Sequence, residues 1–302
     1  MESQAIVNLL KGKGPQTGAE LLESTGMEPL SLWQMCQRTP AIYSQRVGKR
    51  YMRLDKNVDG YARLSPSIRR EFQTYTVLGL EDQTAEIETR TRLLNEEILR
   101  ISQDKLALAK DAIEATVQLL AEKETILKHV CFLIAGDITY DMAHAVPRPE
   151  ISTGKMVRGS DLDIIVIAED SVPEETLKVL DDAILKKKYF LLAHPNYQEE
   201  IDYLVKNIAR VREQLAFDSF PHMIASKIIH ESWLLYGSPE VFKKVKNMAE
   251  EFGVPGKLAL LEQQAEKFRE EAENRLLYSD GRQVDAAFLN LFYTSEEGDE
   301  IY

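Results

Sequence analysis

The sequence GSDLDIIVI at residues 159–167 places two carboxylates at the start of an apolar, β-branched run. β-Branched residues favour strands, and in a strand the side chains at i and i+2 point to the same face. Asp161 and Asp163 should therefore share a face, while the apolar residues buried behind them anchor the strand. Buried carboxylates are unfavourable without a cation or donor, so the pair predicts oxygen ligands for a divalent metal. A strand that opens with two solvated aspartates is the alternative interpretation.

The segments before this strand predict a second buried strand and a turn. Residues 130–135, VCFLIA, form an apolar run that ends at Gly136-Asp137. Residues 138–145 are expected to form a short helix, and a loop with prolines and glycine then leads to Arg158. The two predicted strands and the turn are thus close neighbours in the chain.

The segments after the aspartates predict one more strand and several helices. A helix is expected to begin at residues 171–175, where a proline and two glutamates suit a helix N-terminus. Residues 200–205 predict a third strand, in which Glu200 and Asp202 share a face. Further helices are expected over residues 225–236, 240–252 and 257–278, and the acidic end at residues 295–300 is expected to fray.

Residues 1–80 predict a small domain of three short helices and a hairpin. The hairpin strands are expected at residues 41–46 and 50–54, with the turn between them. This order resembles a winged helix-turn-helix, in which the third helix, residues 28–38, would enter a DNA major groove. A module that mediates only protein contacts is the alternative. The residues expected to contact DNA phosphates are Arg46, Lys49 and Arg50, and the obvious base-reading side chains are Gln34, Gln37 and Arg38.

Residues 63–80 are expected to connect this module to a helical linker over residues 81–129. Leucine and isoleucine recur every seven residues in the linker, and no proline or glycine interrupts it. A long helix or a pair of helices is therefore predicted. A dimerising coiled coil ranks lower, because Lys110 and Glu124 interrupt the second seam position.

Composition limits the classes of protein to consider. The chain has 302 residues and a net charge of -12, and its first 80 residues hold 11 Lys and Arg against 7 Asp and Glu, whereas the rest holds 26 against 42. The acidic part disfavours extended nucleic-acid contact, so DNA contact is expected only at the N-terminal segment. The apolar runs are shorter than the ~20 residues that span a bilayer, so no membrane association is expected.

The cysteines and histidines indicate neither a disulfide framework nor a zinc site. Cys36 and Cys131 lie far apart, and the five histidines lack metal-type spacing. The first residues, MESQ, do not follow the layout of a signal peptide. A cytoplasmic location is therefore expected.

The strand, the Gly136 turn, the Asp-x-Asp strand and the later acidic strand together resemble the nucleotidyltransferase fold of the DNA polymerase beta superfamily. The likeness covers about residues 110–255. It implies a pair of Mg²⁺ or Mn²⁺ ions, held by the catalytic residues Asp161, Asp163 and Asp202. Because Glu200 is expected on the same face as Asp202, it is the alternative third carboxylate.

The resemblance also implies where a nucleoside triphosphate would bind. Backbone N–H groups of the Gly136 turn would meet its phosphates, and the other candidates are Asp137, Thr139, Ser160 and Lys227. The family usually has Ser or Gly where this chain has Asp137, and the loop after the turn lacks the family's Arg-x-x-Gly. A degenerate site that binds a nucleotide without turning it over is thus an alternative.

These observations predict an α+β protein that is a metal-dependent nucleotidyltransferase. It would move a nucleotidyl group from a nucleoside triphosphate to a protein or a small molecule, with release of pyrophosphate. The alternatives are a DNA-binding transcriptional regulator whose degenerate domain senses a nucleotide, and a scaffold that forms homodimers through its linker. The predicted parts are a winged helix-turn-helix at 1–80, a helical linker at 81–129, a nucleotidyltransferase core with a mixed sheet at 130–207, and C-terminal helices with an acidic tail at 208–302.

Overall fold

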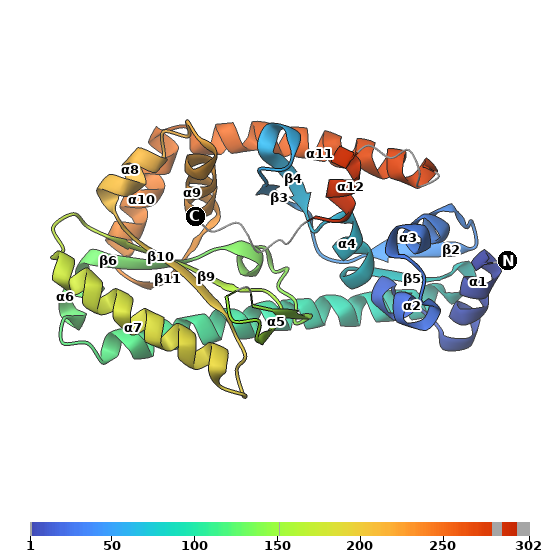
Figure 1. The fold of residues 1–302 in the computed structure, drawn as a ribbon, viewed down its shortest axis with the longest axis horizontal. Helices are drawn as coiled ribbons and strands as arrows, with labels where there is room; N and C mark the ends of the chain where they lie inside the picture. The colour runs from blue at the N-terminus through green and yellow to red at the C-terminus, as the bar shows by residue number, and fades with distance from the viewer. Residues whose placement is uncertain (1, 151, 280–285, 295–302) are drawn as a thin grey trace. The chain divides into compact units, whose positions relative to one another are not determined.

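The structure is a computed structural model that describes residues 2–150, 152–279 and 286–294 (Figure 1). It is a mixed α+β protein whose chain packs into two compact units. The first unit combines residues up to 97 with the described part of 259–300, and the second consists of the described residues between 98 and 258. Helices α5 (Thr84–Gln118) and α11 (Val254–Tyr278) each contribute residues to both units.

The first unit begins with the helices that the sequence predicts. Thr17 caps the second helix, since its Oγ1 accepts a hydrogen bond from Glu20 N at 3.3 Å while Glu20 Oε2 accepts from Thr17 N at 2.7 Å. Gly26, with a φ of 64°, ends that helix. The elements are α1 (Glu2–Lys13), β1 (Gln16–Thr17), α2 (Gly18–Thr25), α3 (Pro29–Arg38), β2 (Ile42–Arg46), β3 (Tyr51–Leu54), η1 (Asp59–Tyr61), β4 (Ala62–Ser65), α4 (Ile68–Thr74), β5 (Thr76–Leu80), η2 (Glu81–Gln83) and α12 (Ala286–Phe292).

The predicted pairing of the N-terminal hairpin is wrong, although both of its strands exist. β2 pairs with β5 and β3 pairs with β4, so the three-stranded sheet has the order β1-β5-β2. β5 is buried at all five positions and takes the centre of this sheet. Residues 63–80 are therefore part of the unit and not a connector. Alternation of side chains reveals a strand but does not name its partner.

The C-terminal helices complete the core of the first unit. Ala272 and Leu276 of α11, with Leu291 and Phe292 of α12, are buried in one cluster with side chains of α1 to α4. Trp33 of α3 meets the ring of Phe292 edge-on, with centroids 5.8 Å apart. Segments from the two ends of the sequence thus share one hydrophobic core.

The second unit is built on a four-stranded mixed sheet of order β10-β9-β6-β11. β9 and β10 are parallel, and the other pairs are antiparallel. This mixed sheet agrees with the expected fold class. Its elements are α6 (Lys123–His129), β6 (Val130–Ile134), η3 (Gly136–Tyr140), β7 (Pro147–Pro149), β8 (Met156–Arg158), β9 (Leu162–Ala168), α7 (Glu174–Ala193), β10 (Ile201–Asn207), α8 (Ile208–Gln214), α9 (Phe220–Glu231), β11 (Trp233–Gly237) and α10 (Pro239–Glu251).

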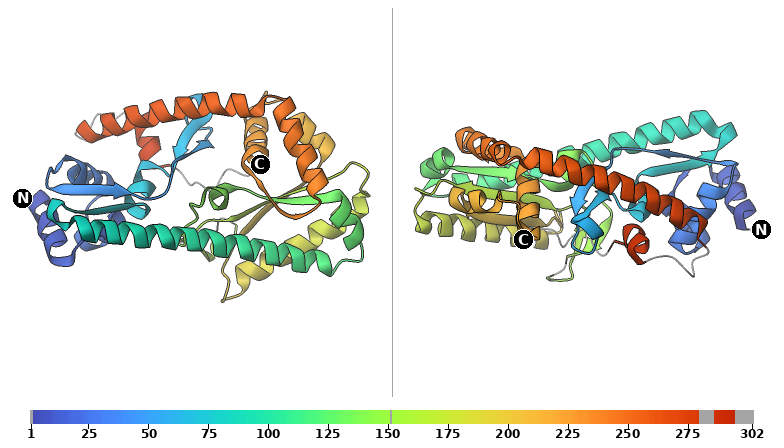
Figure 2. Two further views of the ribbon diagram at one scale, coloured as in Figure 1. Left: turned by 180° about the vertical axis from the view of Figure 1, so that it is seen from behind. Right: turned by 90° about the horizontal axis from the view of Figure 1, so that it is seen from above.

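Helices cover both faces of this sheet (Figures 1 and 2). Phe132, Ile164 and Val166 lie in one buried cluster with side chains of α5, α6 and α7. Cys131 and Ile165, which alternate with them and are also buried, point to the other face, where α8 and α10 contact the sheet. Burial on both faces explains why the central strands read as continuous apolar runs.

Two predicted helices differ in the structure. Residues 225–236 are helical only to Glu231, because Ser232 is extended and residues 233–237 form β11, which pairs with β6. Short apolar runs do not separate a buried helix from a strand by period alone. Residues 138–145 do not form the expected helix. A 3₁₀ turn, η3, spans Gly136–Tyr140 and ends at Asp141, whose φ is 56°.

The helices predicted over residues 81–129 are confirmed as α5 and α6, which are separated by residues 119–122. The apolar side chains that recur every seven residues pack onto the sheet of the second unit, where Ile113 and Val117 are fully buried. None of the helices in the described residues combines the length and apolar composition that crossing a bilayer requires.

Arg269 is the basis of a first prediction. Its buried guanidinium donates to Glu273 at 2.7 Å and to Pro66 O at 2.8 Å, and it lies 3.4 Å from Glu71. Removing one partner from a buried charge network leaves the others uncompensated. We expect Arg269→Ala to lower the free energy of unfolding by about 3 kcal/mol. Arg275→Ala, on an exposed position of the same helix, should change it by less than about 0.5 kcal/mol in urea titrations followed by circular dichroism.

Candidate metal and nucleotide site

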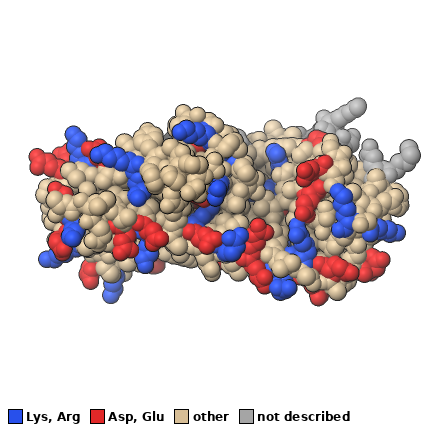
Figure 3. Space-filling model, turned by 90° about the horizontal axis from the view of Figure 1, so that it is seen from below, with Lys and Arg blue, Asp and Glu red and all other residues tan. Residues whose placement is uncertain are grey.

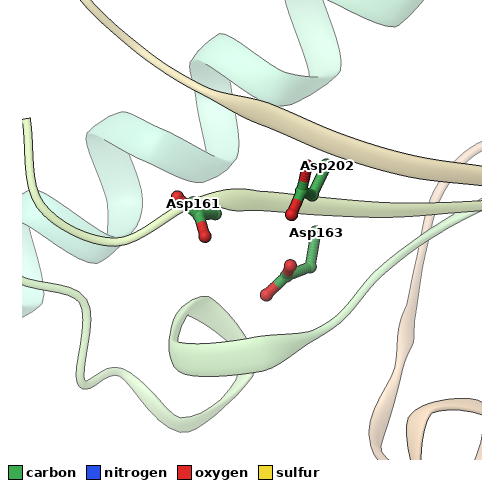
Figure 4. A group of neighbouring side chains, drawn as sticks. All are labelled: Asp161, Asp163 and Asp202. Carbon is green, nitrogen blue, oxygen red and sulfur yellow. The ribbon is translucent and has the colours of Figure 1, made fainter. Parts of the chain in front are cut away.

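Parallel pairing of β9 and β10 brings the predicted carboxylates together. Asp163 lies directly opposite Asp202 in the register, and residues in register on parallel strands point to the same face. Asp161 precedes β9 by one residue and lies two residues before Asp163. One carboxylate oxygen from each aspartate lies within 4.8 Å of the others (Figure 4).

The cluster offers ligands suited to a hard divalent cation. Its donors are all carboxylate oxygens, which Mg²⁺ and Mn²⁺ prefer over the nitrogen and sulfur ligands typical of zinc. Each of the three aspartates is partly exposed. The residue types and their spacing therefore fit the metal that the sequence predicts.

Gly136 allows Asp163 to lie against the turn after β6. Its φ is 71°, and a Cβ built there would lie 2.0 Å from Asp163 Oδ2. Ala135 N also donates to Asp163 O at 3.0 Å, which ties the end of β6 to β9. Glycine is thus required both for the left-handed backbone and for the close approach of the carboxylate.

Asp137 and Ser160, both predicted to contact nucleotide, contact each other. Ser160 Oγ donates to Asp137 Oδ2 at 2.6 Å and accepts from His144 N at 3.2 Å. Thr139 Oγ1 donates to Gly136 O at 2.8 Å. All of these side chains are buried, so their hydrogen bonds fix the turn and the loop that precedes β9.

Glu231, at the end of α9, contacts Gly136 and Lys227, the two remaining residues that were predicted to bind a nucleotide. Its carboxylate accepts from Gly136 N at 3.4 Å and from Tyr140 Oη at 2.6 Å, and it pairs with Lys227. Gly136 and Lys227 therefore meet at the buried carboxylate of Glu231. Sequence reasoning missed Glu231, although its spacing of four residues from Lys227 on a helix was a usable signal.

Two cations that the sequence analysis also missed contact the aspartate cluster. Lys188 of α7 lies 3.0 Å from Asp202 Oδ1. Arg148 of β7 contacts Asp161 Oδ1, and its Nη2 donates to Glu200 at 2.9 Å. Glu200 is thus a partner of Arg148. Burial raises the pKa of Glu200, and the guanidinium partly offsets this rise.

A buried ion pair supports the loops that carry these side chains. Lys105 of α5 donates to Glu199 Oε2 at 2.5 Å and to Arg158 O at 2.7 Å. Burial lowers the pKa of Lys105 and raises that of Glu199, while their mutual attraction opposes both shifts. The pair anchors the segments immediately before β9 and β10.

The predicted DNA-contacting cations lie near acidic side chains of the first unit. Arg50 makes two hydrogen bonds of 2.6 Å to Glu71 and a third of 2.6 Å to Glu273, and Arg46 lies 3.6 Å from Glu71. Both arginines line a cavity of about 420 Å³. Lys49 lies between β2 and β3. Arg46 and Arg50 are thus partly neutralised by acidic side chains of the same unit.

Two of the three predicted base-reading side chains of α3, Gln34 and Arg38, contact the end of α11. Gln34 Nε2 donates to Leu276 O at 2.6 Å and to Ser279 O at 3.2 Å. Arg38 Nη2 donates to Leu277 O and also to Ser279 O, the latter at 3.2 Å. Side-chain nitrogens of these two residues that would donate hydrogen bonds to DNA bases are therefore already bound to backbone oxygens of this chain.

No protein-family model and no curated protein matches this chain.

The Gly136 turn generates a second prediction. Gly136→Ala should weaken Mn²⁺ binding by about tenfold or more, because the new methyl group displaces the carboxylate of Asp163. Gly154→Ala is a matched control, since Gly154 has a similar φ of 66° but no neighbouring atom within 4 Å of the point where a Cβ would lie. Both variants carry about 1–2 kcal/mol of backbone strain. Equal Mn²⁺ affinities of the two variants in calorimetric titrations would contradict this account.

Proposed function

We propose that the second unit is a metal-dependent nucleotidyltransferase. The observation that carries the proposal is the convergence of Asp161, Asp163 and Asp202, whose carboxylate oxygens lie within 4.8 Å of one another. The mixed sheet and the Gly136 turn beside the cluster add support, since the resemblance to the DNA polymerase beta superfamily implies both. A protein or a small molecule would accept the nucleotidyl group.

In this proposal the three aspartates hold Mg²⁺ or Mn²⁺. A bound cation supplies Lewis-acid chemistry, which neutralises phosphate charge and lowers the pKa of an attacking hydroxyl. Asp161 and Asp163 act as ligands, and Asp202 completes the set and takes the proton of the attacking hydroxyl. Lys188 contacts Asp202 and holds its carboxylate in position through an ion pair.

The reaction replaces the phosphoanhydride bond between the α- and β-phosphates with a phosphoester bond to the acceptor oxygen. The acceptor oxygen bonds to the α-phosphorus, and the bond from that phosphorus to the oxygen bridging to the β-phosphate breaks. The electron pair of the broken bond leaves with pyrophosphate. Gly136 N–H and Lys227 are the donors proposed for the phosphates, and the phosphates would take the place of the Glu231 carboxylate that both now contact.

The charge distribution favours a small or protein acceptor over a long nucleic acid. On the face shown in Figure 3, Lys and Arg side chains are interspersed with Asp and Glu side chains. A nucleic-acid track needs clustered positive charge that neutralises consecutive phosphates. The excess of acidic residues beyond residue 80 acts in the same direction.

Removal of two aspartates tests the proposal. The double variant Asp161→Ala, Asp163→Ala should lower Mg²⁺-dependent release of pyrophosphate from nucleoside triphosphates by about a thousandfold or more, because the metal ligands are lost. Asp104→Asn, at an exposed position of α5, should leave the rate unchanged. Equal release by wild type and the double variant, with all four triphosphates and either Mg²⁺ or Mn²⁺, would reject the proposal.

A second candidate is a DNA-binding regulator whose second unit senses a nucleotide without turnover. It is favoured by the internal contacts of the proposed phosphate-binding groups: Ser160 donates to Asp137, and Glu231 accepts from Gly136 N. In this candidate residues 1–80, whose sequence resembles a winged helix-turn-helix, bind DNA phosphates through Arg46, Lys49 and Arg50. Base reading would require Gln34 and Arg38 to leave the end of α11.

The two candidates differ in measurable ways. A regulator should bind a nucleoside triphosphate with no release of pyrophosphate, and it should shift the DNA upstream of its own coding sequence. That shift should weaken steeply with added salt. Pyrophosphate release without any DNA shift at low salt would instead favour the enzyme.

A further inference from the structure

Arg148 is held beside the aspartate cluster by two hydrogen bonds and an ion pair, which tie it to residues 159–161 and to Glu200. Its Nε donates to Gly159 O at 3.0 Å, its Nη2 donates to Glu200 Oε2 at 2.9 Å, and the same nitrogen contacts Asp161 Oδ1. Pro147 and Pro149 flank it in β7 and restrict the backbone there. Its guanidinium is thus positioned by the fold.

The contact with Asp161 conflicts with metal binding at the same oxygen. The guanidinium of Arg148 brings a positive charge to the cluster. A divalent cation bound at Asp161 would lie beside that charge, and like charges in a partly buried site repel each other. Arg148 and a metal therefore compete for Asp161.

Glu200 is a second carboxylate that binds the guanidinium of Arg148. Its side chain is only 8% exposed, and a carboxylate buried to this degree needs a cation or a donor. It lies next to Ile201 at the start of β10, two residues before Asp202. When Arg148 releases Asp161, it therefore keeps the bond to Glu200 and stays beside the cluster.

We propose that Arg148 is a built-in counter-ion that stabilises the metal-free aspartate cluster. When a divalent cation binds, Arg148 leaves Asp161 and keeps Glu200 as its one carboxylate partner. Arg148 is then a positioning residue and not a metal ligand or a catalytic residue. This inference rests on the proposed metal site. It explains how three carboxylates lie together before a cation arrives, and it predicts that the protein weakens its own metal affinity.

The test is Mn²⁺ binding to the full-length protein without nucleotide, measured from the electron paramagnetic resonance signal of free Mn²⁺. Arg148→Gln removes the competing charge and should tighten Mn²⁺ binding by about tenfold. Arg148→Lys keeps a positive charge and should bind Mn²⁺ within about threefold of wild type. Arg158→Gln, an exposed arginine of the neighbouring strand β8, is the matched control and should leave the affinity unchanged. A purely structural role for Arg148 predicts the opposite sign, namely weaker binding in Arg148→Gln.

Unchanged or weaker Mn²⁺ binding by folded Arg148→Gln overturns the proposal, as does the absence of binding by both wild type and this variant. If circular dichroism shows that Arg148→Gln does not fold, the Mn²⁺ affinity of Glu200→Gln tests the proposal instead. That change leaves Arg148 dependent on Asp161, so Mn²⁺ binding should weaken by about tenfold, and an unchanged affinity overturns the proposal. Failure of the enzyme proposal is distinguishable, since it appears as absent pyrophosphate release while the Mn²⁺ affinities still follow Arg148.

Discussion

The parallel register of β9 and β10 is the constraint on which the candidate site depends. It sets Asp163 opposite Asp202, and a slip of one residue would send the Asp202 carboxylate to the other face of the sheet. Leu162 and Ile201, paired at the start of the two strands, are both fully buried. A slip would expose one of them, so hydrophobic burial fixes the positions of the carboxylates.

Mutual repulsion among the three aspartates is offset by groups from several other elements. Arg148 comes from a short hairpin strand, Lys188 from α7, and the loop that carries Asp161 is held through Ser160 and Asp137. Charged clusters of this kind need compensation from the fold itself when no ion is bound. These contacts already occupy several groups that a nucleotide and its cations would bind. A bound ligand would therefore replace hydrogen bonds and ion pairs that the protein makes with itself.

The first unit uses its polar groups in a comparable way. Glu71 and Glu273 form ion pairs with three arginines, Arg46, Arg50 and Arg269, of which Arg269 is fully buried. Burial alone would raise the pKa of Glu71. Hydrogen bonds from Arg50 and the charge of Arg269 reverse this, so the pKa of Glu71 lies below its ordinary value. DNA binding by this unit would therefore compete with ion pairs and hydrogen bonds that already stabilise α3, α4 and α11.

The sequence alone determined the local features. The apolar strands at 130–134 and 162–168, the helices over residues 81–129 and the shared face of Asp161 and Asp163 follow from propensity and period, which act over a few residues. The proximity of Asp202 followed from adding the resemblance to a known family. Enzymatic activity and DNA binding stay predictions.

Only the tertiary structure decided which segments meet. β2 pairs with β5 and not with the nearby β3, and β11 is a strand where a helix was expected. Helix α11 packs into the same hydrophobic core as the N-terminal helices. Arg148, Glu231 and Lys188 joined the site for the same reason. A lone charged residue in a loop or on a helix has no periodic pattern, and its partner is selected by packing between residues far apart in the chain.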